Sequence, residues 1–281
     1  MTPVVGPGIG WRAELSDLLL ELSEPGGGLC FTEQIAERVH HGVPEGLRTL
    51  IDRGVPVVAH GVSLGLAGAD RPDRGRLARL AEAAVTLRSP LVSEHVAVVR
   101  ATRPADGPDL HADVLEAGHL VPGPRTRESL AVLVENVREA MDALPAPLAL
   151  ENPAGTLAWP EDELDEPAFL TELAERSGCL LLLDLANLHV SCRAFGGDPH
   201  ALLERMPLER VAYAHIAGGA EHDGVYLDSH AHDIPDPVFD LLRHFRELTS
   251  GRTPGVMIER DDDIDVPTTR REWGVLRSIL G

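Results

Sequence analysis

Short apolar runs alternate with longer amphipathic stretches along the whole chain. The short runs are bounded by Gly, Pro or polar residues, which is typical of β-strands. The four consecutive leucines at 180–183 show no polar alternation, as expected of a parallel strand buried on both faces. Eight strands are predicted: Val4–Ile9, Leu29–Ile35, Pro56–Val62, Leu91–Val96, Leu148–Asn152, Leu180–Leu185, Val211–Ile216 and Val256–Glu259.

The longer stretches predict helices, several with Pro in the first turn or with Ser, Thr or Asp just before it. The predicted helices include Arg74–Leu87, Arg127–Leu144, Pro167–Ser177, Pro199–Met206, Pro237–Leu248 and Thr268–Ile279. Eight strands that alternate with helices predict an α/β fold, a single-domain (β/α)8 TIM barrel over residues 1–281. The length of 281 residues fits one such barrel as well as two smaller domains.

A doubly wound parallel sheet is the alternative fold. Its dinucleotide-binding form carries a glycine motif of fixed spacing after the first strand, and Gly6-Pro7-Gly8-Ile9-Gly10 lacks that spacing. These glycines indicate a tight turn or a close approach of two backbones. The longest irregular stretch, residues 97–126, is rich in Pro and Gly and predicts a loop that covers a site or forms a substrate wall. The acidic stretch Glu161–Glu166 is expected on the solvated surface.

Composition excludes several functions. The 25 basic residues are all arginine, so Schiff-base lysine catalysis and a Walker-type phosphate loop are excluded. The net charge of −20 disfavours general binding to nucleic acid or to an anionic membrane. We therefore expect neither nucleic acid nor membrane as a partner.

Cysteine usage and the N-terminus predict a cytoplasmic protein. The three cysteines are Cys30, Cys179 and Cys192, an odd number without zinc-site spacing. Cys30 and Cys179 lie in apolar runs and are expected to be small buried residues in a reducing compartment. No secretory signal and no apolar run long enough for a membrane span is visible.

The last six predicted strands each end in a His, Asp or Glu that follows apolar residues. Taken singly, such a residue is commonly structural, as a hydrogen-bonded His or a helix-capping Asp. In a TIM barrel, however, the carboxyl ends of the strands form one mouth, where active sites lie. The six residues are His60, His95, Glu151, Asp184, His215 and Glu259.

These side chains cannot share a dry cleft unless their charges are compensated, and the simplest compensation without lysine is a metal ion. The loop after the seventh strand adds Asp228 and His230, while His189, His222 and His232 are weaker candidates, either ligands or neighbouring residues. Four imidazoles and four carboxylates exceed the roughly four to six donors of one ion, which predicts two or three ions with bridging carboxylates. Ligands of nitrogen and oxygen without sulfur suit iron, manganese or zinc.

In chain order, these motifs resemble the multinuclear non-haem iron-dependent oxidative enzymes, a family that includes the oxidase of methanobactin biosynthesis. The resemblance covers nearly the whole chain, and although each motif is short, the ordered set on eight strands is specific. It rests on Gly8–Arg12, His60–Leu64, Ser93–His95, Glu151-Asn152, Asp184–Asn187, His215–Gly218, Asp228–His230 and Glu259.

The resemblance implies a TIM barrel that holds two or three iron ions, Fe(II) and Fe(III) together, with the eight residues above as ligands. Asn187 matches a position that can also face the metals. O2 is the implied co-substrate, and hydrogen is removed from a substrate carbon while the protein positions the substrate and tunes the metals. Characterised relatives oxidise side chains of ribosomally made peptides, most commonly cysteine.

The implied substrate is thus a precursor peptide, and a separate leader-binding protein is a possible partner, because little length remains here beyond a barrel. Pro153-Ala154-Gly155 stands where many relatives carry small polar residues, and the loop around His119 is rich in Pro and Gly. Because of these two departures, the resemblance does not identify the substrate peptide.

Two rival functions fit the same residues. Sugar isomerases or epimerases and endonuclease IV-type hydrolases also hold divalent ions at the mouth of a barrel, although a nuclease must grip phosphates and the charge of −20 opposes this. A metal-holding scaffold is the second rival, but structural sites are usually closed, whereas a barrel mouth is open.

Overall fold

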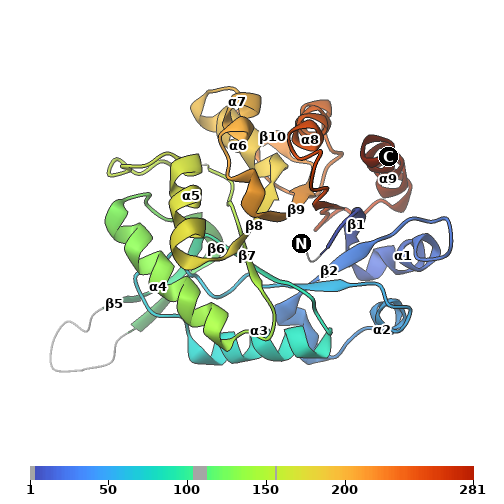
Figure 1. The fold of residues 1–281 in the computed structure, drawn as a ribbon, viewed down its shortest axis with the longest axis horizontal. Coiled ribbons are helices and arrows are strands. Elements are labelled where there is room, and N and C mark those ends of the chain that lie inside the picture. Colours follow the sequence, from blue (N-terminus) through green and yellow to red (C-terminus); the bar gives the residue numbers. More distant parts are fainter. Residues whose placement is uncertain (1–3, 104–112, 156) are drawn as a thin grey trace.

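The computed structural model describes residues 4–103, 113–155 and 157–281. Eight parallel strands close into a barrel, with β1 paired to both β2 and β12 (Figure 1). The predicted TIM barrel is confirmed, and every predicted strand overlaps an observed one. In spatial order the strands are β1 (Pro7–Gly10), β12 (Gly255–Ile258), β9 (Val211–Ile216), β8 (Leu180–Asp184), β7 (Leu148–Glu151), β4 (Val92–His95), β3 (Val57–His60) and β2 (Phe31–Ile35).

Helices surround this barrel (Figure 1), and the predicted helices are all present with ends within two residues of the expected ones. The α-helices are α1 (Ser16–Leu22), α2 (Glu45–Asp52), α3 (Arg74–Thr86), α4 (Arg127–Ala143), α5 (Glu166–Ser177), α6 (Leu185–Phe195), α7 (Pro199–Glu204), α8 (Asp236–Leu248) and α9 (Val266–Leu280). Three 3-10 helices are η1 (Ala13–Leu15), η2 (Ala36–His41) and η3 (Leu208–Arg210). Among the described residues, no helix combines the length and the apolar character that crossing a membrane requires.

The strands separate two apolar clusters because successive side chains point to opposite faces. Helix-facing residues such as Val57, Leu181 and Val256 belong to a large core between the barrel and the helices. The alternate residues form a smaller cluster inside the barrel, which we call the floor layer. It contains Val4, Phe31, Val58, Leu91, Ala149, Leu182, Ala212, Tyr213 and Met257.

Glycines at β1 make room for this floor layer. Gly6 has a φ of +74°, in the left-handed region that favours glycine. A Cβ on Gly8 would lie 2.9 Å from the ring of Phe31. The glycine-rich segment is therefore both a tight turn and a close approach, as the sequence predicts.

The prediction of an irregular stretch over residues 97–126 is wrong for much of its length. β5 (Ala97–Arg103) and β6 (Asp113–Pro122) form an antiparallel hairpin that leads away from the barrel (Figure 1). Gly118, with a φ of +66°, lies where the register of this hairpin shifts. Pro104, Gly107 and Pro108, which suggested a loop, fall outside the described residues.

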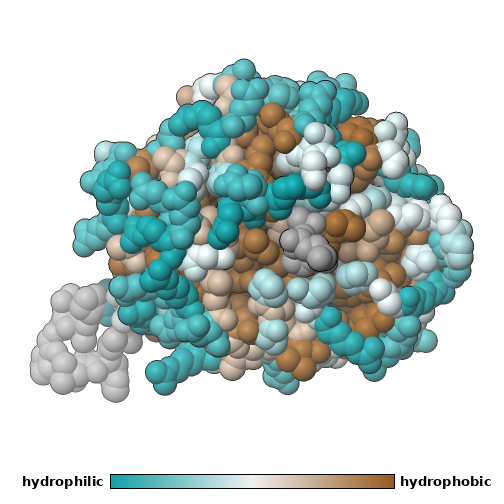
Figure 2. Space-filling view, viewed as in Figure 1, coloured by the Kyte–Doolittle hydropathy of each residue, from teal (hydrophilic) through white to brown (hydrophobic). Residues whose placement is uncertain are grey.

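A second pair of short strands, β10 (Ala220–His222) and β11 (Val225–Leu227), forms a hairpin after β9. The space-filling view shows mostly hydrophilic side chains over α4 and α5 (Figure 2), as amphipathic helices around a barrel require.

Two smaller predictions need correction. Cys179 is buried as expected, but Cys30 is exposed because β2 begins only at Phe31. In the acidic stretch, Glu161 and Glu163 are exposed as predicted, whereas Asp162 and Glu166 are half-buried. Asp162 is drawn inward because it accepts hydrogen bonds from the backbone and side chain of Arg125.

Candidate metal centre

The chemistry-bearing residues form a second layer inside the barrel, directly above the floor layer. In six strands a floor residue is followed two positions later by a His, Asp or Glu, because alternate residues share a face. We call this the ligand layer. It consists of Glu33, His60, Glu151, Asp184, His215 and Glu259, which follow Phe31, Val58, Ala149, Leu182, Tyr213 and Met257.

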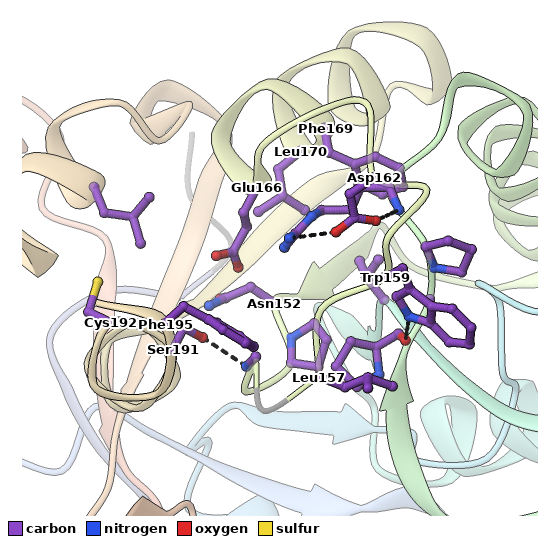
Figure 3. Close-up of a pocket in the computed structure, with 18 of the residues that line it drawn as sticks. Asn152, Leu157, Trp159, Asp162, Glu166, Phe169, Leu170, Ser191, Cys192 and Phe195 are labelled. Carbon is purple, nitrogen blue, oxygen red and sulfur yellow. Dashed lines mark hydrogen bonds and ion pairs between the residues drawn. The ribbon is translucent and has the colours of Figure 1, made fainter. Parts of the chain in front are cut away.

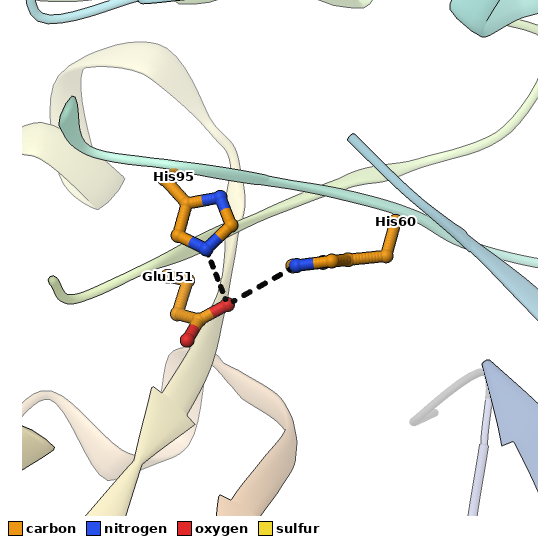
Figure 4. A group of neighbouring side chains, drawn as sticks. All are labelled: His60, His95 and Glu151. Atoms are coloured by element: carbon orange, nitrogen blue, oxygen red, sulfur yellow. Dashed lines mark ion pairs between the residues drawn. The ribbon is translucent and has the colours of Figure 1, made fainter. Parts of the chain in front are cut away.

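His60, His95 and Glu151 form the first cluster, at the ends of β3, β4 and β7 (Figure 4). The Glu151 Oε2 atom lies 3.2 Å from His95 Nε2 and 3.7 Å from His60 Nε2. The other ring nitrogens face the protein: His60 Nδ1 lies 2.9 Å from the Ser93 hydroxyl and His95 Nδ1 lies 3.2 Å from the Gly61 carbonyl. Both Nε2 atoms are thus directed toward one carboxylate oxygen.

Glu151 also belongs to a second cluster with Asp184, His215 and Glu259. His215 Nδ1 lies 2.9 Å from Glu259 Oε2, 3.8 Å from Glu151 Oε1 and 4.0 Å from Asp184 Oδ2. Asp184 ends β8 and caps α6, accepting a hydrogen bond from the Asn187 backbone through Oδ1. Its Oδ2 atom remains directed at the cluster.

Glu259 joins a third cluster, with His230 and Asp261. His230 Nδ1 lies 2.9 Å from Asp261 Oδ2 and 3.6 Å from Glu259 Oε2. Its Nε2 lies 2.7 Å from Asp228 Oδ1, but without hydrogen-bond geometry. His230 has a φ of +50°, so the loop adopts a strained conformation that brings its ring to the mouth.

The hydrogen bonding of the nitrogen and oxygen atoms at this site shows whether the residues fit a metal ion. Among the described residues, 15 buried side-chain nitrogen or oxygen atoms lack a hydrogen-bond partner, and seven belong to the predicted ligands. Such atoms are costly to bury unless something else binds them. The seven are Glu151 Oε2, Asp184 Oδ2, Asn187 Oδ1, His215 Nδ1, Asp228 Oδ1, His230 Nε2 and Glu259 Oε2. Their nitrogen and oxygen chemistry fits metal ions, so the site is able to hold them.

The pKa shifts of the clustered residues also indicate that the buried carboxylates require positive charge nearby. Burial raises the pKa of Glu151 well above its usual value, and the carboxylates of Glu259 and Asp184 add to this rise. Burial and the carboxylate of Asp228 raise the pKa of Asp184 to about 6. Burial alone would lower the pKa of His215, but Glu33, Glu259 and Glu151 raise it well above its usual value. Without metal, protons therefore supply the positive charge that the carboxylates require.

Comparison with known proteins identifies the family of this chain. A family model described as "RiPP precursor modification enzyme MbnB/TglH/ChrH" matches residues 6–279. The chain belongs to this family. The resemblance found in the sequence is confirmed, since the suspected oxidative enzymes are this group.

Similar proteins from other bacteria carry the general name "UPF0276 protein". One from Streptomyces avermitilis is 50% identical over 278 residues, which are 98% of this chain and 55% of that protein. The chain therefore spans about half the length of this relative. One from Caulobacter vibrioides is 34% identical over 268 residues, covering 94% of this chain and 90% of the relative.

Solved structures with the same fold include endonuclease IV from Thermus thermophilus, with a TM-score of 0.60 and 17% identity over 98% of both chains. D-psicose 3-epimerase from Clostridium cellulolyticum has a TM-score of 0.54 and 11% identity over 98% of this chain and 95% of that one. At such low identity the likeness shows the TIM barrel alone.

Two further acidic residues of the site do not lie at the end of a predicted strand. Glu33 forms a fourth cluster with His60 and Glu259. It accepts a hydrogen bond from the Tyr213 hydroxyl and lies 3.2 Å from His215 Nε2 and 4.0 Å from His60 Nδ1. It was missed because β2 continues to Ile35, but its period-two spacing from Phe31 would have revealed it. Asp261 follows the last strand in a loop and also pairs with buried Arg12, and no local pattern marks it.

The three weaker histidine candidates join none of the clusters among the described residues. His189 packs its ring against Tyr226, with centroids 5.5 Å apart. His222 is exposed beside Asp223, and His232 lies 2.9 Å from the Ser229 hydroxyl. The side chain of Asn187, in contrast, is buried: its amide nitrogen donates to the Asn152 carbonyl, while its oxygen has no partner among the described residues.

Proposed function

We propose that this chain is an oxidoreductase in which two or three iron ions and O2 oxidise a cysteine side chain of a ribosomally synthesised precursor peptide. The observation that carries the proposal is the overlap of the four clusters found among the described residues. Glu151 belongs to the first and second, His60 to the first and fourth, and Glu259 to the second, third and fourth. Carboxylates shared in this way are typical of sites in which neighbouring metal ions are bridged.

In this proposal His60, His95 and Glu151 hold the first ion, and Glu151, Asp184, His215 and Glu259 hold the second. Glu259 and His230 hold the third, together with Asp228 and Asn187. Asp261, which sequence reasoning did not include, is a further candidate beside His230. In seven of these residues, all except His60, His95 and Asp261, a buried atom without a hydrogen-bond partner supplies the donor.

The protein's own contribution is to orient these ligands. The Ser93 hydroxyl holds His60 at Nδ1 and the Gly61 carbonyl holds His95 at Nδ1, which leaves both Nε2 atoms free. Glu33 accepts from His215 Nε2, so that Nδ1 faces the cluster. Buried partners of this kind fix the tautomer and the direction of a metal-bound histidine.

Iron bound here would supply one-electron redox chemistry and a site for O2, which no protein side chain of this set provides. Membership of a family that modifies RiPP precursors supports a peptide as the substrate. We further propose a separate leader-binding protein as a partner, as the resemblance implies.

The test uses anaerobically purified protein loaded with Fe(II) and a cysteine-containing peptide encoded beside its gene. We expect O2 consumption and a mass change of the peptide at cysteine. The Glu151→Gln variant, assayed in parallel, should show neither. Equal modification by zinc-loaded protein or without O2 would contradict the proposal, and turnover of a ketose with manganese would favour the isomerase alternative.

A further inference from the structure

A cavity of about 370 Å3 lies beside the metal centre, between the loop after β7 and helices α5, α6 and α7 (Figure 3). Phe169 and Leu170 of α5 form a buried apolar wall. Trp159 and Phe195 are partly exposed at its rim, and Trp159 is fixed by a 2.9 Å hydrogen bond from its indole nitrogen to the Pro122 carbonyl. The cavity therefore offers aromatic and aliphatic surface to a side chain.

The charges around this cavity do not balance. Its two guanidinium groups are already paired, Arg125 with Asp162 at 2.8 Å and Arg205 with Asp165. Asp198 caps α7 by accepting from the His200 backbone. Within the described part of the chain, Glu166 and Asp198 form no ion pair, so the lining carries excess negative charge.

Glu166 is the carboxyl group of this lining for which burial matters most. Figure 3 shows its carboxyl group directed toward the side chain of Asn152. Burial raises the pKa of Glu166 to about 7, even though Arg125 and Asn152 act to lower it. A carboxylate in an apolar cavity is stabilised when a cation enters beside it.

Asn152 connects the cavity to the metal centre. Its side chain accepts a 2.8 Å hydrogen bond from the Asp184 backbone nitrogen and donates one of 3.2 Å to the Asp184 carbonyl. It also follows Glu151 directly in the chain. The cavity and the ligand layer thus share a wall.

We propose that this cavity binds a basic side chain of the substrate peptide, with Glu166 as its counter-charge and the rings of Trp159 and Phe195 against its methylene groups. The peptide as occupant rests on the proposed function, whereas the cationic chemistry rests on the unbalanced carboxylates in an apolar cavity. Cations are attracted to the faces of aromatic rings, so the same rings favour lysine or arginine. The net charge of −20 draws basic peptides toward the protein as a whole.

The experiment compares two probes on the metal-free full chain: Nα-acetyl-lysine N-methylamide and its neutral analogue without the ε-ammonium group, Nα-acetyl-norleucine N-methylamide. Tryptophan fluorescence reports binding because Trp159 is 36% exposed, whereas Trp11 and Trp273 are each 4% exposed. We expect the lysine probe to bind about tenfold more tightly than the norleucine probe. Glu166→Gln should remove this preference, and Glu161→Gln, which changes an exposed carboxylate outside the cavity, should retain it.

Equal affinity for the two probes, or a preference that survives Glu166→Gln, would overturn the proposal, as would no binding of either probe. The Trp159→Phe variant shows whether the signal comes from the cavity, and circular dichroism shows that each variant is folded. Because the protein is free of metal and no turnover is measured, failure here is distinguishable from failure of the oxidase proposal.

Discussion

The floor layer and the ligand layer lie on the same strands, two residues apart, and they serve opposite purposes. The floor residues are apolar except for the hydroxyl of Tyr213 and pack against one another. The ligand-layer residues bring carboxylates and imidazoles together and leave several polar atoms without partners. Packing stabilises the first layer, whereas the second costs stability until cations bind.

This contrast teaches how one barrel combines stability with reactivity. The strand period of two keeps both layers inside the barrel and separates them along the strand. Tyr213 joins them, since its ring packs edge-on against Phe31 with centroids 5.9 Å apart, and its hydroxyl donates to Glu33. Variants in each layer should therefore have separable effects.

The largest effect is expected in the ligand layer. Glu151→Gln removes the carboxylate that two clusters share. We expect the loss of at least one metal ion per chain and a fall in turnover of about a thousandfold or more, because metal stabilisation of the transition state is worth several kcal/mol. Elemental analysis and single-turnover kinetics measure both.

Glu37→Gln is the matched control, at a half-buried glutamate that belongs to none of the clusters among the described residues. Glu37 accepts hydrogen bonds from the Val62 backbone and the Ser63 hydroxyl through one oxygen, Oε1. The amide oxygen of glutamine can accept the same two bonds, so metal content should stay unchanged. A Glu151→Gln variant with full metal content would show that the clusters are misassigned.

A substitution that creates a cavity in the floor layer should lower the stability of the protein instead. Leu182 is fully buried inside the barrel. Leu182→Ala should reduce the free energy of unfolding of the metal-free protein by about 2–5 kcal/mol, measured by urea denaturation. The folded variant should still bind its full complement of metal; if it binds none, the two layers are not separable.

The residue that joins the layers should show an intermediate effect. Tyr213→Phe keeps the ring but removes the hydroxyl that holds Glu33 and, at 2.8 Å, Ser93. Because Glu33 and Ser93 orient His215 and His60, we expect metal affinity to fall about 10- to 100-fold. Competition with a chelator measures this loss, and unchanged affinity would mean that the network does not position the ligands.

A smaller effect, on pH dependence, comes from Glu166, a carboxyl outside both layers. Its folded-state pKa of about 7 exceeds the ordinary value of 4.5, so the folded protein binds this proton more tightly. The wild type therefore loses stability as pH rises from 4.5 through 7, by up to about 3 kcal/mol, relative to Glu166→Gln.

Urea denaturation of both proteins at pH 5 and pH 8 measures this difference. It should be the same with and without metal, because Glu166 belongs to none of the metal clusters. A difference that disappears when metal is added would tie Glu166 to the ligand layer.

Much of the fold and of the candidate site is predictable from the sequence, because local patterns specify both. The run Leu181-Leu182-Leu183 followed by Asp184 gives a buried strand and its functional end. Once a barrel is inferred, its geometry brings such ends together, although they lie far apart in the sequence. Burial and proximity of His60, Glu151 and Asp184 follow from this reasoning, while their roles as ligands remain predictions.

What the sequence does not reveal depends on contacts between distant segments. Asp261 approaches His230 only because a loop with a positive φ places the ring there. The β5–β6 hairpin lies among Pro and Gly residues that indicate a loop. The cavity beside the metal centre draws its lining from helices and loops that no single motif identifies.

The central claim, that shared carboxylates hold neighbouring iron ions, is tested most directly by anomalous X-ray scattering. Crystals of anaerobically purified protein would be measured on both sides of the iron absorption edge. The account predicts two or three iron peaks in the ligand layer, with Glu151 and Glu259 each contacting two of them. A single peak, or peaks of another metal that persist after growth with added iron, would contradict it.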